Sequence, residues 1–124
     1  MPVKRTPDDR FAREGATGTL LIASGANLSN VLTLHDKVLM GLHVPSGIAG
    51  SIFTFQAADP AGAFNLVYDD GGSEVQVVFG AERAVGIDLT GALASFRELR
   101  VRTGPTGSLN AQAGNMVIGW DAKA

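Results

Sequence analysis

The sequence predicts an all-β fold, an antiparallel sandwich or barrel of about eight short strands. From residue 17 onward, short apolar runs alternate with clusters of Gly, Asn, Asp, Ser and Pro, a pattern typical of strands separated by turns. Within most runs the apolar residues recur at every second position, as in strands with one packed and one open face. In no long segment do apolar residues recur with the period of an α-helix. We therefore expect an extended arm over residues 1–16 and one β domain over residues 17–124.

The expected strands follow one another at spacings of about 8–12 residues. Turns separate them at residues 45–47, 59–62 and 70–73, and a short helical turn is expected at residues 91–96. The Asp-Gly-Gly-Ser sequence at 70–73 is the clearest hairpin turn, because glycine accepts the positive φ that tight hairpins require. The predicted strands are residues 19–24, 37–44, 51–57, 64–69, 74–79, 83–89, 98–103 and 115–121.

The alternation also assigns a core-facing set of side chains to most strands. In residues 51–57, for example, Phe53 and Phe55 share one face while Thr54 and Gln56 occupy the other. The other predicted core faces are Val38/Met40/Leu42/Val44, Phe64/Leu66/Tyr68, Val75/Val77/Phe79, Val85/Ile87/Leu89, Leu99/Val101 and Met116/Ile118/Trp120.

The first sixteen residues have a different composition. They carry seven charged side chains and two prolines, and Phe11 is their one large aromatic residue. A segment of this kind cannot fill a core, so we expect an extended arm. Two interpretations stay open, a tail without a role and an arm that becomes ordered on a neighbouring subunit with Phe11 as its anchor.

Composition narrows the classes of function. The chain has no cysteine, which excludes a disulfide scaffold and a cysteine nucleophile. Its formal net charge of −2 argues against general binding of nucleic acid, and no apolar run reaches the ~20 residues of a membrane span. The start of the chain lacks the apolar segment of a signal peptide, so synthesis in the cytoplasm is expected. Because only 18% of residues are charged and 45% are hydrophobic, we expect large contact surfaces in an assembly.

The search for chemistry finds no set of residues that predicts an enzyme or a cofactor. His35 and His43 lie eight residues apart without a third ligand of fixed geometry, so we expect surface histidines and no metal site. Asp69, Asp70 and Glu74 cluster hard oxygen ligands, but they do not follow the spacing of an EF-hand, and a turn role is favoured over calcium binding.

Two groups of side chains are candidates for an interface. Arg97, Arg100 and Arg102 form the one basic cluster, either as a solvated face or as a stripe that meets an acidic patch on another subunit. The aromatic residues Phe64, Tyr68 and Trp120 suggest a sugar-stacking platform, but they occupy predicted core positions, so packing in the core is favoured.

Residues 51–120 resemble small virion structural proteins of tailed bacteriophages. The likeness covers a little over half of the chain and rests mostly on turn and core residues. It implies a β-sandwich of the jelly-roll or discoidin-like kind, and a place among phage structural proteins such as capsid decoration or head-fibre proteins. The segments that carry it are IFTFQ at 52–56, FNLVYD at 64–69, EV at 74–75, RAVGIDL at 83–89, FRELRVRTG at 96–104 and NAQA at 110–113.

This resemblance implies a non-enzymatic capsid decoration protein, located on the outer surface of the phage head. Its partners would be the major capsid protein and other copies of itself, with a trimer as the expected oligomer. Two alternatives stay open, a carbohydrate-binding module of a tail or fibre and another tail or connector component. From the residues alone, the interface is expected to include Phe11, Arg97, Arg100 and Arg102.

Overall fold

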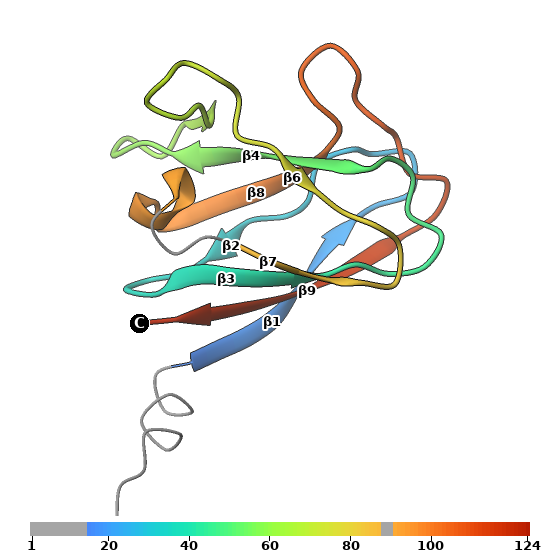
Figure 1. The fold of residues 1–124 in the computed structure, drawn as a ribbon, viewed down its shortest axis with the longest axis horizontal. Helices are drawn as coiled ribbons and strands as arrows, with labels where there is room; N and C mark the ends of the chain where they lie inside the picture. The colour runs from blue at the N-terminus through green and yellow to red at the C-terminus, as the bar shows by residue number, and fades with distance from the viewer. Residues whose placement is uncertain (1–14, 88–90) are drawn as a thin grey trace, which may run out of the picture.

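The computed structural model describes residues 15–87 and 91–124, which form two antiparallel sheets packed face to face (Figure 1). The predicted all-β sandwich is therefore confirmed. One sheet, named here the β1 sheet, has the order β1-β9-β3-β7 and consists of β1 (Gly15–Ile22), β9 (Met116–Lys123), β3 (Val38–His43) and β7 (Ala84–Gly86). The other, the β4 sheet, has the order β2-β8-β4-β5 and consists of β2 (Leu32–Thr33), β8 (Glu98–Thr103), β4 (Ile52–Ala58) and β5 (Phe64–Leu66), with β6 (Val77–Val78) also paired to β4.

Strands β5 and β6 are two pieces of one interrupted strand. Both run antiparallel to β4 along the same border, β5 opposite residues 56–58 and β6 opposite residues 52–53. Between them the chain leaves the sheet at Val67 and returns at Val75, whose N–H donates to the Val67 carbonyl. With β5 and β6 counted as one, the sheets contain strands 1-8-3-6 and 2-7-4-5 in chain order, which is the arrangement of a jelly roll.

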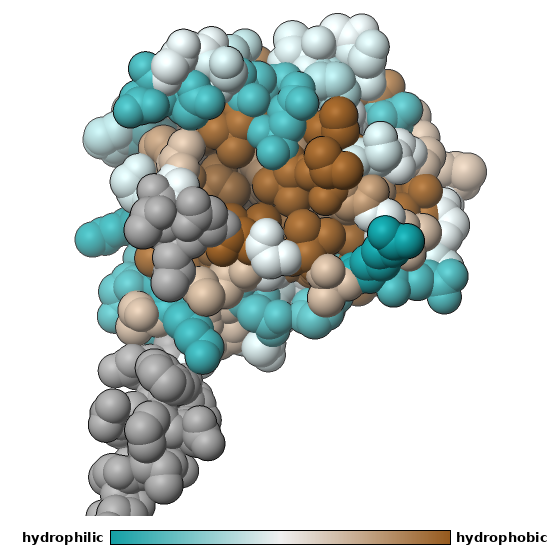
Figure 2. Space-filling model, in the orientation of Figure 1, coloured by the Kyte–Doolittle hydropathy of each residue, from teal (hydrophilic) through white to brown (hydrophobic). Residues whose placement is uncertain are grey.

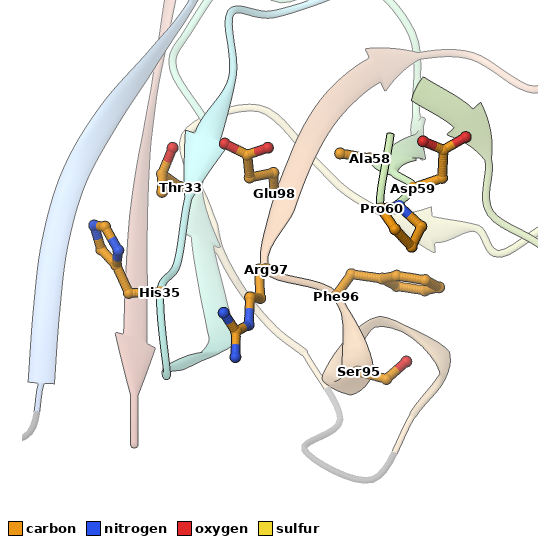
Figure 3. A pocket seen from close by; sticks show the side chains of 9 residues that line it. All are labelled: Thr33, His35, Ala58, Asp59, Pro60, Ser95, Phe96, Arg97 and Glu98. Atoms are coloured by element: carbon orange, nitrogen blue, oxygen red, sulfur yellow. The ribbon is translucent and has the colours of Figure 1, made fainter. Parts of the chain in front are cut away.

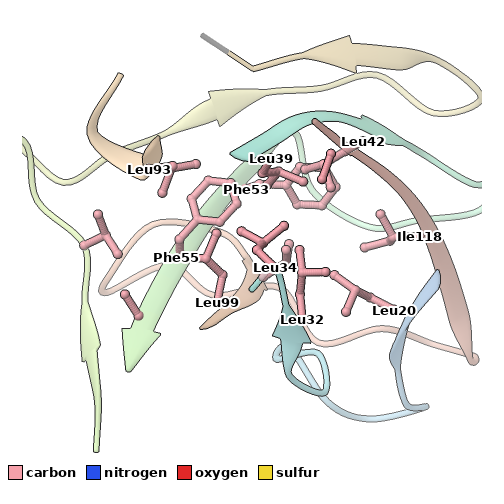
Figure 4. Close-up of a cluster of buried hydrophobic side chains, with 14 of the residues drawn as sticks. Leu20, Leu32, Leu34, Leu39, Leu42, Phe53, Phe55, Leu93, Leu99 and Ile118 are labelled. Atoms are coloured by element: carbon pink, nitrogen blue, oxygen red, sulfur yellow. The ribbon is translucent and has the colours of Figure 1, made fainter. Parts of the chain in front are cut away.

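The core lies between the two sheets and follows the predicted alternation in the long strands. Phe53 and Phe55 of β4, Leu99 and Val101 of β8 and Ile118 of β9 are fully buried (Figure 4). The Phe53 ring stacks on Phe79, with ring centroids 4.1 Å apart. These aromatic and aliphatic groups provide most of the apolar area removed from water, which is the main stabilising contribution in a sandwich.

The predicted core face of residues 37–44 is wrong at its start. A β-bulge shifts the register of β3 against β9 between Leu39 and Gly41. Leu39 and Leu42 consequently both point into the core, while Met40 is only partly buried. One extra residue in a bulge reverses the facing of the residues on one side of it, so a strict period of two fails here.

The predicted core face of residues 64–69 is also wrong. Leu66 lies opposite Gln56 on the outer side of β4, so the next residue, Val67, points into the core and is buried. Tyr68 is 50% exposed because the chain turns away from the sheet there. The alternation in FNLVYD is compatible with either face, and burial selects the one that carries Val67.

Several element boundaries differ from the expected ones. Strand β1 begins at Gly15, so Gly15 and Ala16 belong to the β1 sheet and not to the expected arm. Residues 1–14, with Phe11 among them, and Leu89 lie outside the described residues. The two-residue strand β2 was not predicted. The expected helical turn is present as a 3₁₀ helix, η1 (Ala92–Ser95).

The two predicted turns after β4 and β5 share one design. In each, an aspartate side chain accepts hydrogen bonds from the N–H groups two and four residues later, Ala61 and Ala63 for Asp59, and Gly71 and Ser73 for Asp69. A glycine three residues after each aspartate has a positive φ, 91° at Gly62 and 87° at Gly72. The repeated Asp-x-x-Gly sequence is thus the signal for both loops.

Gln112 ties together three loops at one end of the sandwich. Its side chain is buried, accepts a hydrogen bond from the Ala49 N–H and donates to the Ala49 carbonyl and the Thr103 hydroxyl. Its backbone binds Gly25 and Ala26 of the loop after β1. The side chain and backbone of this one residue therefore bind polar groups of the β1–β2, β3–β4 and β8–β9 connections.

Replacement of Gln112 by leucine should destabilise the domain by about 1–3 kcal/mol for each buried partner left without a hydrogen bond. Urea unfolding followed by circular dichroism measures the change. The matched control is Gln56→Leu, the same change at a half-buried glutamine on the outer side of β4, which should shift the midpoint far less. Equal midpoints for Gln112→Leu and the wild type would contradict this role of the amide.

Candidate functional site

Arg102 is enclosed by the chain's own polar groups. It is 7% exposed, and its Nη2 donates to Glu74 Oε2 at 2.9 Å and to Thr106 Oγ1 at 2.8 Å. Its Nε donates to Thr54 Oγ1, which in turn donates to the Gly104 carbonyl. Arg102 thus connects β4, β8, the β8–β9 loop and the hairpin of residues 68–74, and it is not part of an accessible surface.

Glu74 completes this buried group. One of its oxygens accepts hydrogen bonds from the Thr106 hydroxyl and from Arg102, and the other accepts the Thr106 N–H. Burial raises the pKa of Glu74, but the Thr106 hydrogen bonds and the Arg102 charge outweigh this effect, and the net pKa lies below its ordinary value. Glu74 is therefore an internal partner of Arg102.

The other two arginines of the predicted cluster differ in burial, because Arg100 is half-buried with its Nε covered while Arg97 is exposed. The Arg100 guanidinium lies over the Phe64 ring, 4.4 Å from its centroid, a cation–π contact between β8 and β5 across β4. Arg97 is exposed and precedes β8. The three arginines therefore do not form one stripe, because each has a different environment.

The aromatic residues Phe64, Tyr68 and Trp120 do not gather into a platform. Trp120 packs against the core from β9, and its indole lies over Gly18 of β1, where an added Cβ would come within 2.7 Å of the ring. Phe64 lies on the β4 sheet with Arg100 stacked on it, and the half-exposed Tyr68 follows β5. The prediction of core packing holds for Trp120 and is wrong for Tyr68.

The acidic and histidine candidates are also separated. Asp69 binds the backbone of its own turn while Glu74 faces Arg102, so the two do not converge on a calcium site. His43 is exposed and its Nε2 lies 2.6 Å from Asp121 Oδ2 on the neighbouring strand β9. His35 occupies the turn after β2 with a positive φ of 56°. Among residues 15–87 and 91–124, no group of three or more His, Asp or Glu side chains is placed to hold a metal ion.

A shallow hollow of about 740 Å³ opens at the end of the sandwich where β2, β4 and β8 meet loops (Figure 3). His35 and Phe96 lie at opposite sides of it, with Arg97 and Glu98 between them. A second hollow of about 330 Å³ continues past Phe96 to Tyr68. The Asp59 carboxylate at their junction binds its own turn, and the hydrogen bond from the Ala63 N–H leads the effects that lower its pKa. The polar side chains around the first hollow therefore do not converge on one point, and most of the surface that lines it is apolar.

The outer face of the β1 sheet presents small and apolar side chains on a regular ladder. Leu21 and Val117 are directly paired across β1 and β9 and are 42% and 52% exposed. The rows beside them carry small residues, which are Thr17, Thr19, Gly41, Ala84, Gly86 and Gly119. The paired His43 and Asp121 side chains also project from this face, beside Gly119 and Gly41. Exposed apolar pairs on a flat sheet are typical of a contact surface.

Apolar side chains also gather on the face that carries β6 and β7 (Figure 2). Val78 is the most exposed of them at 73%, whereas Val77, Val85 and Ile87 are partly buried against the core. The interface predicted from the sequence consisted of Phe11 and three arginines and included neither apolar surface. The signal for the first was the uncharged run GATGTLLI at residues 15–22, which reads as an ordinary strand.

The pH dependence of stability should reveal the Arg102–Glu74 pair. Because the pKa of Glu74 is lower in the folded state, its ionised form stabilises the fold above the ordinary carboxyl pKa, and this contribution is lost as the pH falls through the folded pKa. In urea titrations, Glu74→Gln should be clearly less stable than the wild type at pH 7, and the difference should shrink below about pH 4. A difference that stays constant from pH 7 to acid would contradict the assignment.

Comparisons with protein-family models, with curated proteins and with solved structures found no match to this chain. In the described part of the chain, no helix is both long and apolar enough to cross a membrane.

Proposed function

We propose that this chain is a non-enzymatic structural protein of a tailed-phage virion, and that it acts as a decoration protein on the outside of the assembled head. The proposal combines the resemblance over residues 51–120 with the jelly-roll sandwich described above. A sandwich with exposed apolar side chains on its surface suits a protein that works by binding.

The observation that carries the proposal is the outer face of the β1 sheet. Leu21 and Val117 form an exposed apolar pair near one end of β1 and β9, beyond the part of β9 that pairs with β3, and the adjacent Thr19 adds no bulky side chain. Burying apolar area of this kind is the general driving force for association. A sandwich that spans neighbouring capsid subunits through this face would stabilise the assembled head by mass action, because it binds only the assembled state.

The N-terminal arm would add contacts to this interface, whereas the exposed Arg97 precedes β8 of the other sheet. Ordering of the arm costs conformational entropy, which contacts made by Phe11 have to offset. Because β1 begins at Gly15, deletion of residues 1–14 removes the arm without removing a paired strand residue. The truncated protein should fold with near-native stability and bind heads more weakly in co-sedimentation. Undiminished binding would show that the arm has no part in it.

A carbohydrate-binding module remains the second candidate, and one observation favours it. Tyr68 is half exposed beside the hollow that ends at Phe96, so an aromatic face is available next to a depression. A glycan array probed with the purified chain tests this candidate. Binding that is lost in Tyr68→Ala would favour it over head decoration.

A charge placed at the Leu21–Val117 pair on the outer face of the β1 sheet should weaken head binding. Val117→Glu exchanges a half-buried apolar contact for a carboxylate, and we expect at least about tenfold weaker co-sedimentation with heads that lack the protein. Val78→Glu makes the same change on the β6 surface and should bind like the wild type. Circular dichroism confirms that both variants fold. Loss of binding in Val78→Glu with full binding in Val117→Glu would contradict the choice of surface.

A further inference from the structure

Strand β1 is a sheet edge that no element among residues 15–87 and 91–124 covers from Gly15 to Thr19. It lies at the border of its sheet, paired on one side with β9 over all eight residues (Figure 1). Its sequence, GATGTLLI, contains no charge and no proline, and its register against β9 has no bulge. Edge strands are normally short, charged, bulged or covered, because their free N–H and C=O groups otherwise pair with another strand.

The other sheet borders in the described part of the chain do carry such protection. Strand β2 has two residues and β7 has three, and the border formed by β5 and β6 is interrupted by the hairpin of residues 68–74. Among these borders, β1 alone is long and paired without a bulge.

The backbone groups that β1 points outward can be identified from its pairing. The Leu21 N–H donates to Asn30 Oδ1 and the Leu21 carbonyl accepts the Asn30 N–H. The backbone N–H and C=O groups of Leu21 therefore point away from β9. Alternate residues of an antiparallel strand point the same way, which assigns outward N–H and C=O groups to Gly15, Thr17 and Thr19 as well. Asn30 closes the edge at Leu21, and among residues 15–87 and 91–124 no partner occupies the edge from Gly15 to Thr19.

We propose that this edge joins two copies of the chain, with β1 of one copy antiparallel to β1 of the other across a two-fold axis at Thr17. In this register the N–H of each Thr17 donates to the carbonyl of the second copy's Thr17. Gly15 likewise pairs with the second copy's Thr19. The outward groups of Gly15, Thr17 and Thr19 are then all satisfied, and Asn30 of each copy ends the pairing.

A second copy is the occupant that this edge fits, because the match needs no other sequence. Among the described residues the open stretch runs from Gly15 to Thr19, and a two-fold axis at Thr17 pairs each free group within it with a free group of the other copy. The Thr17 side chains are exposed and would meet across the axis, a favourable cross-strand pair. The two β1 sheets would become one continuous sheet, and the outer faces with Leu21 and Val117 would lie side by side. The oligomer is a dimer, in place of the trimer expected from the sequence.

The test uses charge at the axis and the full-length chain in solution. Thr17→Lys and Thr17→Glu each place two like charges opposite one another, which should weaken self-association at least about tenfold. An equimolar mixture of the two variants should restore a dimer, because residue 17 of one copy faces residue 17 of the other. The matched control, Thr33→Lys, makes the same change at an exposed threonine of β2 and should leave the dimer intact. Analytical ultracentrifugation measures mass, and circular dichroism confirms folding.

The proposal predicts a wild-type dimer, monomeric single variants and a heterodimer in the mixture. It is overturned if the wild type sediments as a monomer or a trimer up to the millimolar range. It is also overturned if Thr17→Lys remains a dimer, or if the mixture of folded variants stays monomeric. These measurements use no phage heads, so their outcome is independent of the proposed decoration role.

Discussion

The buried ion pair between Arg102 and Glu74 is the interaction on which the arrangement of the β4 sheet depends. The two side chains are 8% and 10% exposed and share Thr106 as a common partner. Leaving either charge buried without the other would be costly, so the hairpin that carries Glu74 has to return to the sheet beside β8. That requirement explains how one sheet border accepts a seven-residue insertion, residues 68–74, without losing the register of β6 against β4.

The same interaction gives the two sheets different roles. On the β4 sheet, the polar groups near the hairpin bind one another, and Arg100 covers Phe64. On the β1 sheet, the edge of β1 from Gly15 to Thr19 is open among the described residues and uncharged, and the outer face carries the His43–Asp121 pair beside the exposed Leu21 and Val117. The buried polar group thus belongs to the β4 sheet, while the β1 sheet offers an apolar pair and unpaired backbone for contacts between molecules.

Much of the fold was predictable from the recurrence of apolar residues at every second position of the strands. It identified β4, β8 and β9 with their buried residues, because these strands are long and paired on both sides. It failed in β3, where a bulge reverses the facing after Leu39, and in residues 64–69, where either face fits the alternation. It placed Arg102 correctly on the outer side of β8 but could not indicate that the Glu74 hairpin would cover it. The arginines were predicted to form a stripe for the same reason. Alternation along a strand indicates which side of the sheet a side chain occupies, but burial depends on which other segments cover that side.

The central claim is that the chain binds the outside of a phage head through its β1 sheet. Cryo-electron microscopy of the virion that contains it tests this claim most directly. The account predicts sandwich-shaped density on the outer surface of the head, with Leu21 and Val117 facing the capsid. Density on the tail or connector, or a sandwich whose β4 sheet faces the capsid, would contradict it.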